Sequence, residues 1–323
     1  MEPTSHHDDR SPATQAFSLP VTRPLAGANQ QALFVIGAPR SGTTLLYKLL
    51  CLHPDTAWIS NYLRRLPQAP VLGAASRVGT ALPAARRSAW FGDGQAYRYG
   101  NKRSLSERAF PSPVEGEPFF ARCGLTADGS QSTVSRTEQQ RRLRRNVRSL
   151  CRAHGNDVFV SKRIAHNQRL PLLAQAFPMA RFVHLVRDGR RVAASLRSVD
   201  WWSGSHMSWY GGSPTEWEQD GRDPWLAAAL HWTHELQDIH AGLRTVDPNQ
   251  VLELRYEDLL AKPVEGITTV CNFARLSTTR EMTDQARTLQ ATTTPLPLDS
   301  AVLASVTDVQ RSALDQYGYG AMA

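Results

Sequence analysis

The sequence predicts an α/β fold in which a doubly wound parallel sheet is flanked by helices. Apolar residues 32–38 are typical of a strand buried on both faces, and they run into a glycine-containing turn and a helical pattern. Residues 157–197 alternate strand, helix, strand and helix, and residues 251–256 add a last strand. Because parallel strands need crossover helices, this alternation favours a doubly wound sheet.

Each element has a local reason. The first helix is expected from Gly42 to about His53, because Pro54 cannot continue it. Strands are expected at the apolar runs 157–162 and 181–187, each followed by a helix, at about 167–177 and 188–197. A further helix is expected over Trp225–Leu243. The strand at 251–256 then ends at Glu257 and Asp258, which suit the first turn of a following helix.

Length and composition indicate one large domain. The chain has 323 residues, of which 41% are hydrophobic and 20% charged, enough to bury a substantial core. Residues 1–30 are polar and proline-punctuated, so we expect a flexible tail before a single domain at 31–323. Two stretches lack periodicity, near 60–135 and 201–224, and are expected to be irregular insertions of the kind that form lids or binding loops.

Cysteine usage and the terminus indicate the compartment. The four cysteines are scattered and form no C-x-x-C pair, so we expect reduced thiols and neither a zinc site nor a disulfide framework. The first ten residues lack the basic and apolar regions of a signal peptide, and no apolar run reaches membrane-spanning length. We therefore expect a cytoplasmic protein with no transmembrane segment.

The chain is basic, with 37 Lys and Arg against 29 Asp and Glu, a net charge of +8. The densest run is Arg136–Arg152, where apolar residues recur at helical spacing and arginines occupy the other face. A solvated basic helix explains this run better than an RNA-binding or acidic-ligand surface, because no nucleic-acid-binding motif accompanies it. Nucleic acid is therefore not an expected partner.

The turn after the first strand, residues 37–42, is called the glycine loop below. A helix that starts at Gly42 presents unpaired backbone N–H groups and the positive end of its dipole, which together suit an anion. Gly37 and Gly42 have the spacing of the nucleoside-triphosphate loop G-x-x-x-x-G-K-[ST], but Thr43 stands where that loop has lysine. The nearby cation is Arg40, so the pattern predicts a phosphate site without the usual β,γ-phosphate lysine.

Other charged or aromatic residues close the later strands. Lys162, Arg187 and Tyr256 each follow a predicted strand, as Arg40 follows the first. Ligands of open parallel sheets bind beyond the carboxyl ends of the strands, so these side chains are expected to converge.

Three segments resemble one family. Residues 39–44 (PRSGTT) resemble the 5′-phosphosulfate loop of sulfotransferases that use 3′-phosphoadenosine 5′-phosphosulfate (PAPS), and residues 187–195 (RDGRRVAAS) are similar to their 3′-phosphate segment. Residues 254–259 (LRYEDL) resemble the segment whose tyrosine lies against the adenine. The resemblance implies a P-loop-like 5′-phosphosulfate loop and a set of nucleotide-binding residues: Arg40, Ser41, Gly42, Thr43, Thr44, Arg187, Ser195 and Tyr256.

The resemblance covers about residues 32–276 and implies sulfuryl transfer from PAPS to a hydroxyl or amine, with 3′,5′-ADP (PAP) as the product and no metal. The acceptor would be a small molecule, a carbohydrate, a lipid or a natural product, bound at the two insertions. Residues 292–297 lack the basic segment that closes over the nucleotide in many members. Arg275, Arg280 or Arg287 could replace that segment, or nothing could.

Sulfuryl transfer needs placed cations and a general base. Arg40 and Lys162 are the expected cations. The base is left open between His166 and the pair Glu115 and Glu117. Members that use histidine carry it two residues after the lysine, where this chain has isoleucine, and the tyrosylprotein branch uses a glutamate after the first helix, where this chain has Ser-Asn at 60–61.

Two other functions compete with this one. A P-loop kinase or nucleotide hydrolase would need a loop lysine and a metal-binding carboxylate at a strand end. A non-catalytic nucleotide- or RNA-binding protein would use the basic run near Arg144. Acceptor identity and oligomeric state are not indicated by the sequence.

Overall fold

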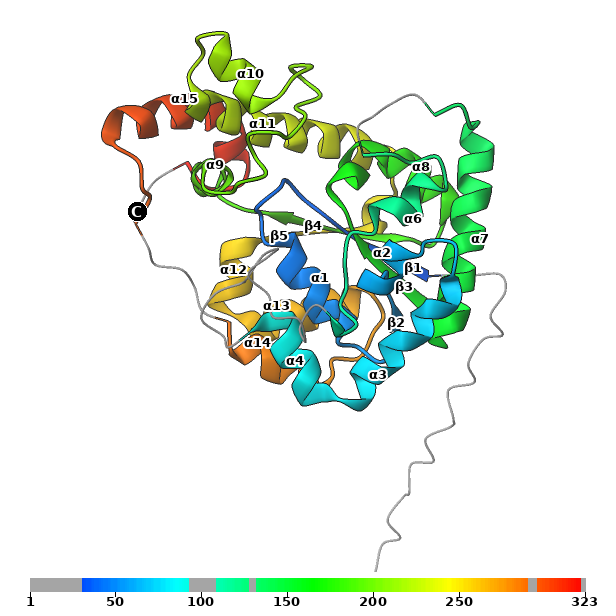
Figure 1. Ribbon diagram of the computed structural model, residues 1–323. Coiled ribbons are helices and arrows are strands. Elements are labelled where there is room, and N and C mark those ends of the chain that lie inside the picture. The colour runs from blue at the N-terminus through cyan, green and yellow to red at the C-terminus, as the bar shows by residue number, and fades with distance from the viewer. Residues whose placement is uncertain (1–30, 93–108, 128–131, 290–294, 321–323) are drawn as a thin grey trace, which may run out of the picture.

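The computed structural model of the chain describes residues 31–92, 109–127, 132–289 and 295–320 (Figure 1). The predicted tail at 1–30 lies outside these ranges, and so do residues 290–294 of the C-terminal region.

A five-stranded parallel sheet forms the centre of the fold, in the order β2-β3-β1-β4-β5. The strands are β1 (Gln31–Ile36), β2 (Thr56–Ala57), β3 (Val158–Lys162), β4 (Arg181–Val186) and β5 (Val251–Arg255). The predicted α/β class is confirmed, and four strands fall within two residues of their expected bounds. The two-residue edge strand β2 was not predicted, because it is too short to show a periodic pattern.

The strand order places a topological switch at the carboxyl end of β1. The chain leaves β1 for β2 and β3 on one side and later returns to β4 on the other. Val35 is paired with Lys162 of β3, and Ile36 with His184 of β4, so three strands end at the same edge. Ligands of open α/β sheets bind at such a switch point.

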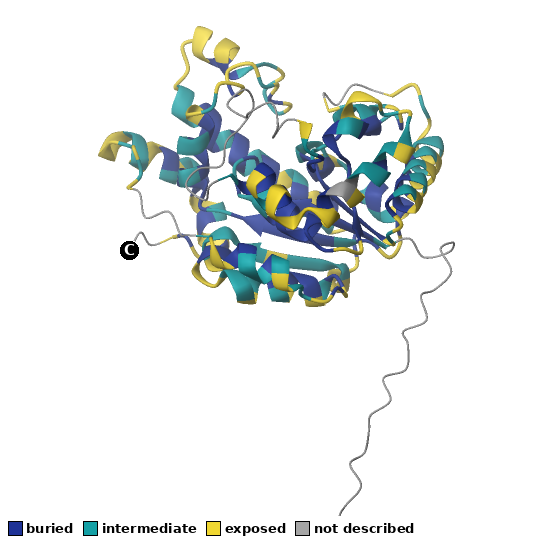
Figure 2. Cartoon of the chain, turned by 60° about the horizontal axis from the view of Figure 1, so that its bottom comes forward, coloured by how far each residue is buried: buried dark blue, intermediate teal, exposed yellow. Residues whose placement is uncertain are grey.

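Successive side chains of β1 point to opposite faces of the sheet and pack into two hydrophobic cores. Leu33 and Val35 face the layer that contains α1 (Thr43–Cys51), α13 (Pro263–Phe273) and α14 (Arg280–Arg287), with α4 (Pro83–Phe91) and α12 (Tyr256–Ala261) at its margin. Figure 2 shows the buried sheet between this layer and the helices of the other face. Because both faces are covered, the central strand β1 is apolar from Ala32 to Ile36.

The other face carries α7 (Arg136–His154), α8 (Leu170–Ala176), α9 (Gly189–Arg197), α11 (Pro224–Leu243) and α15 (Ser300–Gln316). Phe34 of β1 stacks on Phe182 of β4, with ring centroids 5.4 Å apart, and meets Phe159 of β3 edge-on at 6.3 Å. This aromatic contact joins the three central strands directly beneath the switch point.

The first insertion is more helical than expected. Its described residues include α2 (Asn61–Arg65), α3 (Ser76–Ala81), α4, α6 (Glu117–Ala121) and the 3₁₀ segment η1 (Pro70–Ala75). These helices have five to nine residues, so each shows too few turns for a periodic signal, and packing stabilises them. In the second insertion, turns surround one short helix, α10 (Pro214–Gln219), whose start has a Ser213–Glu216 capping box.

Two further 3₁₀ segments flank the core, η3 (Ile164–Arg169) after β3 and η4 (Pro248–Gln250) before β5. All four cysteines are buried, and none of them forms a disulfide, as expected. Among the described residues, no helix combines the length and apolarity needed to cross a bilayer. The assignment of residues 31–323 to one domain stays a prediction.

Candidate active site

The glycine loop has the backbone of an anion-binding turn. Arg40 has φ 68°, a left-handed conformation that costs a non-glycine residue about 1–2 kcal/mol. Gly42 is the N-cap of α1 with φ 86°, and no side chain caps the helix. The helix therefore begins with its N–H groups and dipole facing the switch point and without a capping side-chain hydrogen bond.

The two predicted phosphate segments are joined by hydrogen bonds. Arg40 Nε donates to Ser195 Oγ at 2.8 Å, across 155 residues of sequence. Arg187 Nη1 donates to the Arg40 carbonyl oxygen at 2.9 Å. Strand β4 positions Arg187, and α9 carries Ser195 back to the loop two turns later. The structure thus brings together the residues that the sequence separates into two motifs.

Tyr256 completes this side of the site. The Arg187 guanidinium lies over its ring, 4.7 Å from the centroid. A β-carbon at Gly42 would lie 2.3 Å from the same ring, so only glycine allows Tyr256 to approach the loop. The tyrosine at the end of β5 is therefore packed against the first turn of α1, and its role at the nucleotide stays a prediction.

Two buried polar atoms of this region have no hydrogen-bond partner among the residues that the structure describes. They are Ser41 Oγ and Arg187 Nε, both shielded from solvent. Burial of such groups without partners costs about 1–3 kcal/mol each. A donor hydroxyl and a guanidinium N–H beside an uncapped helix start fit a phosphate-bearing ligand.

The two threonines of the loop differ in exposure. Thr43 is buried, and its methyl group fills the space beside Gly37, where a β-carbon would lie 2.9 Å from it. Thr44 is partly exposed at the helix start. The position of the missing lysine is thus occupied by a side chain that packs inside the loop.

At the end of β3 two adjacent cations pair with two glutamates. The Lys162 ammonium forms an ion pair with Glu115. Arg163 Nε and Nη2 donate to the two oxygens of Glu117, both at 2.6 Å, and Nη2 also donates to the Leu125 carbonyl at 2.8 Å. The cations are buried while the glutamate side chains are 45% and 43% exposed. Each carboxylate thus faces both solvent and a fixed positive charge.

A local strand-like pairing holds the glutamate segment. Ser60 and Pro113 form an antiparallel bridge, and the Val114 N–H donates to the Ile59 carbonyl at 2.9 Å. Gly116 has φ 71°, and a β-carbon there would collide with Ile59. This pairing holds the segment that carries Glu115 against residues 59–61, the region in which the tyrosylprotein branch carries a glutamate.

His166 does not reach this surface, which removes it from our candidates for the base. Its ring is fully buried, packed edge-on against Phe34 and Phe120 at 5.4 and 4.8 Å, and its Nε2 is 3.0 Å from Ser161 Oγ. Burial, with further contributions from nearby cations, lowers its pKa well below the usual value. The strand-end position suggested access, but η3 turns the ring into the core.

Sequence reasoning missed Arg163 and Asn167, which immediately follow the predicted Lys162 and His166. Arg163 anchors Glu117, and Asn167 is 1% exposed with its amide against the glycine loop. The available signal was the density of polar residues after an apolar strand, which a buried strand end rarely carries without a partner.

Metal-ligand side chains gather at one other place among the described residues. One ligand atom each from His184, His240 and Glu253 lies within 4.8 Å of the others. These side chains already have hydrogen-bond partners. His184 Nδ1 lies 3.0 Å from the Glu253 carboxylate, and His240 bonds the Tyr317 hydroxyl. We interpret the cluster as a polar contact that ties α15 to the sheet, and the absence of a metal from the reaction stays a prediction.

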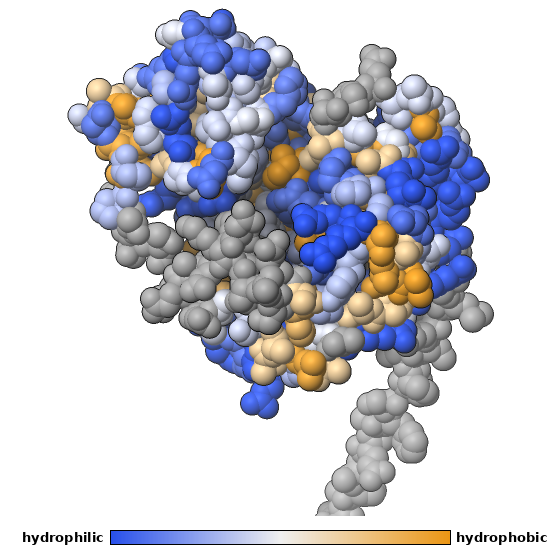
Figure 3. Space-filling view, in the orientation of Figure 1, coloured by the Kyte–Doolittle hydropathy of each residue, from blue (hydrophilic) through white to orange (hydrophobic). Residues whose placement is uncertain are grey.

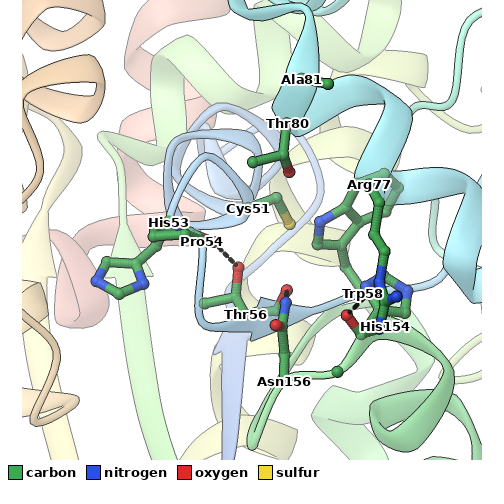
Figure 4. Close-up of a pocket in the computed structure, with 11 residues that line it drawn as sticks. Cys51, His53, Pro54, Thr56, Trp58, Arg77, Thr80, Ala81, His154 and Asn156 are labelled. Atoms are coloured by element: carbon green, nitrogen blue, oxygen red, sulfur yellow. Dashed lines mark hydrogen bonds between the residues drawn. The ribbon is translucent and has the colours of Figure 1, made fainter.

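A cavity of about 430 Å³ lies away from the glycine loop, at the amino ends of β2 and β3 (Figure 4). Arg77 of α3 and His154 of α7 face it, and Arg77 Nε donates to the His154 carbonyl at 3.2 Å. Beside it runs α7, whose hydrophilic surface is visible at the right of Figure 3. The exposed arginines of α7 include a single stripe of Arg141, Arg144, Arg145, Arg148 and Arg152, as the sequence predicts.

The known proteins that this chain resembles are sulfotransferases. A curated relative, omega-hydroxy-beta-dihydromenaquinone-9 sulfotransferase Stf3 of Mycobacterium bovis, is 26% identical over 254 residues, covering 72% of this chain and 59% of the relative. The Mycobacterium tuberculosis protein of the same name matches equally. The chain thus spans about three fifths of the length of these relatives.

Sulfotransferase STF9 of Mycobacterium avium has a similar fold, with a TM-score of 0.57 at 15% identity, over 90% of this chain and 78% of the other. The sequence model of the sulfotransferase family matches residues 32–280, which include the glycine loop, both glutamates, Lys162, Arg187, Ser195 and Tyr256. The chain therefore belongs to the sulfotransferase family.

Proposed function

We propose that this protein transfers a sulfuryl group from PAPS to a hydroxyl or amine of a small-molecule or lipid acceptor. The observation that carries the proposal is the uncapped start of α1 beside two unbonded buried donors, Ser41 Oγ and Arg187 Nε. These donors suit a nucleotide with phosphates at both its 5′ and 3′ positions. The family match favours this function over a kinase or hydrolase and over non-catalytic nucleotide or RNA binding.

The donor-binding residues divide by position. Backbone N–H groups at Gly42–Thr44 and the side chains of Ser41 and Thr44 would hold the 5′-phosphate. Arg187 and Ser195 would hold the 3′-phosphate, and Tyr256 would lie against the adenine. The sulfuryl group that PAPS supplies would then lie on the side of the glycine loop that faces β3.

Lys162 and Glu115 are the catalytic pair in this proposal. Lys162 closes β3 beside the end of β1, where its ammonium would stabilise charge on the sulfuryl and bridging oxygens. Glu115 is partly open to solvent, and its carboxylate would take the proton from the acceptor. Binding of donor and acceptor would separate the Lys162–Glu115 ion pair, because Lys162 would then contact the sulfuryl group and Glu115 the acceptor.

Glu117 has a different assignment. Both of its oxygens accept from buried Arg163, which makes it a support for the segment rather than a free base. We therefore favour Glu115 over Glu117 as the base. Arg40, held by Ser195, remains the second cation of the proposed site.

The acceptor is proposed only as a class. The name of the relative Stf3 indicates a hydroxylated menaquinone as its acceptor, so a hydroxyl-bearing lipid is the first acceptor to test. In the second insertion Trp201 is 49% exposed and suits an apolar acceptor, whereas Trp202 is buried in the core. The cytoplasmic location expected from the sequence stays a prediction.

Two measurements test the function. Calorimetry with PAP in the absence of Mg²⁺ should show tight binding to the full chain. Incubation with PAPS and a panel of hydroxylated lipids, phenols and sugars should give one product heavier by a single sulfuryl group. No PAP binding, or ATP turnover without PAPS, would reject the proposal.

A further inference from the structure

The glycine loop is fixed from below by a side chain that the expected nucleotide contacts do not include. Asn167 Nδ2 donates to the Gly37 carbonyl oxygen at 3.0 Å, and its Oδ1 accepts from the Gly37 N–H at 3.4 Å. One amide thus contacts both backbone polar groups of the first loop residue, in the manner of a short strand. The two residues are 130 positions apart in sequence.

Gly37 is where the loop leaves β1, so its orientation sets the course of the following residues. Its φ is 154°, and a β-carbon there would lie 2.4 Å from the Leu185 carbonyl of β4. Side-chain anchoring is therefore impossible at this residue, and Asn167 anchors the backbone instead. A shift of Gly37 would carry Arg40 and Gly42 with it.

A buried carboxyl group fixes the anchor itself. The second N–H of Asn167 Nδ2 donates to Glu235 Oε2 of α11 at 2.6 Å. The nitrogen is thereby placed toward both Gly37 and Glu235, which defines the orientation of the amide. Burial raises the pKa of Glu235 to about 7, so a fraction is neutral near neutral pH and adds less repulsion to an anion at the loop.

The far side of Glu235 is braced by the second insertion. Trp209 Nε1 donates to His231 Nδ1 at 3.3 Å, and His231 Nε2 lies 3.9 Å from Glu235 Oε1. Burial lowers the pKa of His231 to about 4, so the ring is neutral and can accept from Trp209. A continuous set of contacts therefore runs from residue 209 to residue 37.

We propose that Asn167 is the positioning residue of the glycine loop and that Glu235 holds its amide in the orientation that the loop requires. The inference rests on the proposed role of this loop as the 5′-phosphosulfate site. Neither residue touches the donor in this scheme. Their effect is exerted through Gly37, on the backbone N–H groups and Arg40.

The test compares Asn167→Ala, Glu235→Leu and Glu235→Gln with the wild-type chain by PAP calorimetry, thermal melting and PAPS kinetics. Loss of the Asn167 contacts should weaken PAP binding about tenfold, because the loop backbone then loses its anchoring hydrogen bonds. The KM for PAPS should rise and kcat should fall, with the acceptor KM unchanged. Glu235→Gln keeps an oxygen acceptor for Asn167, so it should bind PAP within about twofold of wild type, unlike Glu235→Leu.

The matched control is Gln285→Ala, which removes another buried amide, one that donates to Thr288 Oγ1 at the end of α14. It should lower the melting temperature and leave PAP affinity unchanged. If Asn167→Ala does not fold, the Glu235→Leu and Glu235→Gln pair decides the question. Wild-type-like PAP affinity and PAPS KM in the folded Asn167→Ala and Glu235→Leu variants would overturn the inference, whereas failure of the wild type to bind PAP would instead reject the proposed function.

Discussion

The nucleotide side and the glutamate side of the site are built in different ways. On the nucleotide side, Arg40, Arg187 and Tyr256 each follow a strand of the central sheet. Arg187 connects them, through a hydrogen bond to the Arg40 carbonyl and a cation–π contact with the Tyr256 ring. On the glutamate side, Glu115 and Glu117 come from an insertion and reach the sheet through ion pairs with Lys162 and Arg163.

The two sides differ in how firmly the surrounding structure holds their residues. Strand ends are fixed by a sheet buried on both faces, so the nucleotide side cannot move without disturbing the core. The glutamate side depends on a few polar contacts to partly exposed carboxylates. We therefore expect changes on the glutamate side to alter turnover strongly, and changes on the nucleotide side to alter donor affinity.

The largest effect is expected at Glu115. Glu115→Gln removes the proposed base and should lower kcat by about 10²–10⁴-fold. Glu117→Gln weakens only the contact with Arg163, so it should cost stability and less than about tenfold in kcat. Steady-state kinetics of both variants, with melting curves, measure the contrast. Equal losses of kcat in the two variants would remove the distinction between base and support.

Lys162 should follow closely. Lys162→Met keeps the length of the side chain but removes the charge, and should lower kcat by about 10²–10³-fold at saturating PAPS. Lys262→Met is the control, because Lys262 is exposed and pairs only with Glu265 in the described structure. Wild-type turnover in Lys162→Met would contradict the assignment of a catalytic cation to β3.

Arg187 should govern affinity instead. Arg187→Ala should weaken PAP by about 10–100-fold, since a hydrogen bond to a charged group contributes about 1.5–3 kcal/mol. The affinity for adenosine 5′-phosphate, which lacks the 3′-phosphate, should fall much less. Calorimetry with both nucleotides gives the ratio. An equal loss for the two ligands would place Arg187 at the loop backbone alone, where it already bonds Arg40.

The nucleotide side could be predicted from sequence because its parts are local. A strand, a glycine turn and a helix start occupy consecutive residues, so one short pattern specifies both structure and chemistry. The glutamate side could not be resolved in this way. The roles of Glu115 and Glu117 depend on which cation each carboxylate contacts, and those contacts join residues 46–47 positions apart. The position of His166 depends on how η3 turns its ring into the core.

The same reasoning explains the missed anchor. In the sequence Asn167 is one of several polar residues after β3. Its contact with Gly37, 130 residues earlier, is visible only in the folded structure. Glu235 lies within an otherwise regular helix, where its spacing matches neither a catalytic motif nor an exposed pair. Long-range polar contacts of this kind have no periodic signal.

The smallest expected effect lies outside both sides and provides a baseline for pH studies. Burial lowers the pKa of His154, at the cavity of Figure 4, to about 4, below the value of about 6.5 for an unfolded histidine. The neutral ring therefore favours the folded state above pH 6.5, and this stability is lost as the pH falls from 6.5 toward 4. At pH 5 the loss of folding stability is about 2 kcal/mol, because the unfolded chain binds the proton more readily.

Melting curves of wild type and His154→Gln between pH 8 and 4.5 measure this loss of stability. The variant should show a shallower decline, and parallel curves would show that other groups control the acid transition, so that pH profiles of turnover report unfolding as well as Glu115.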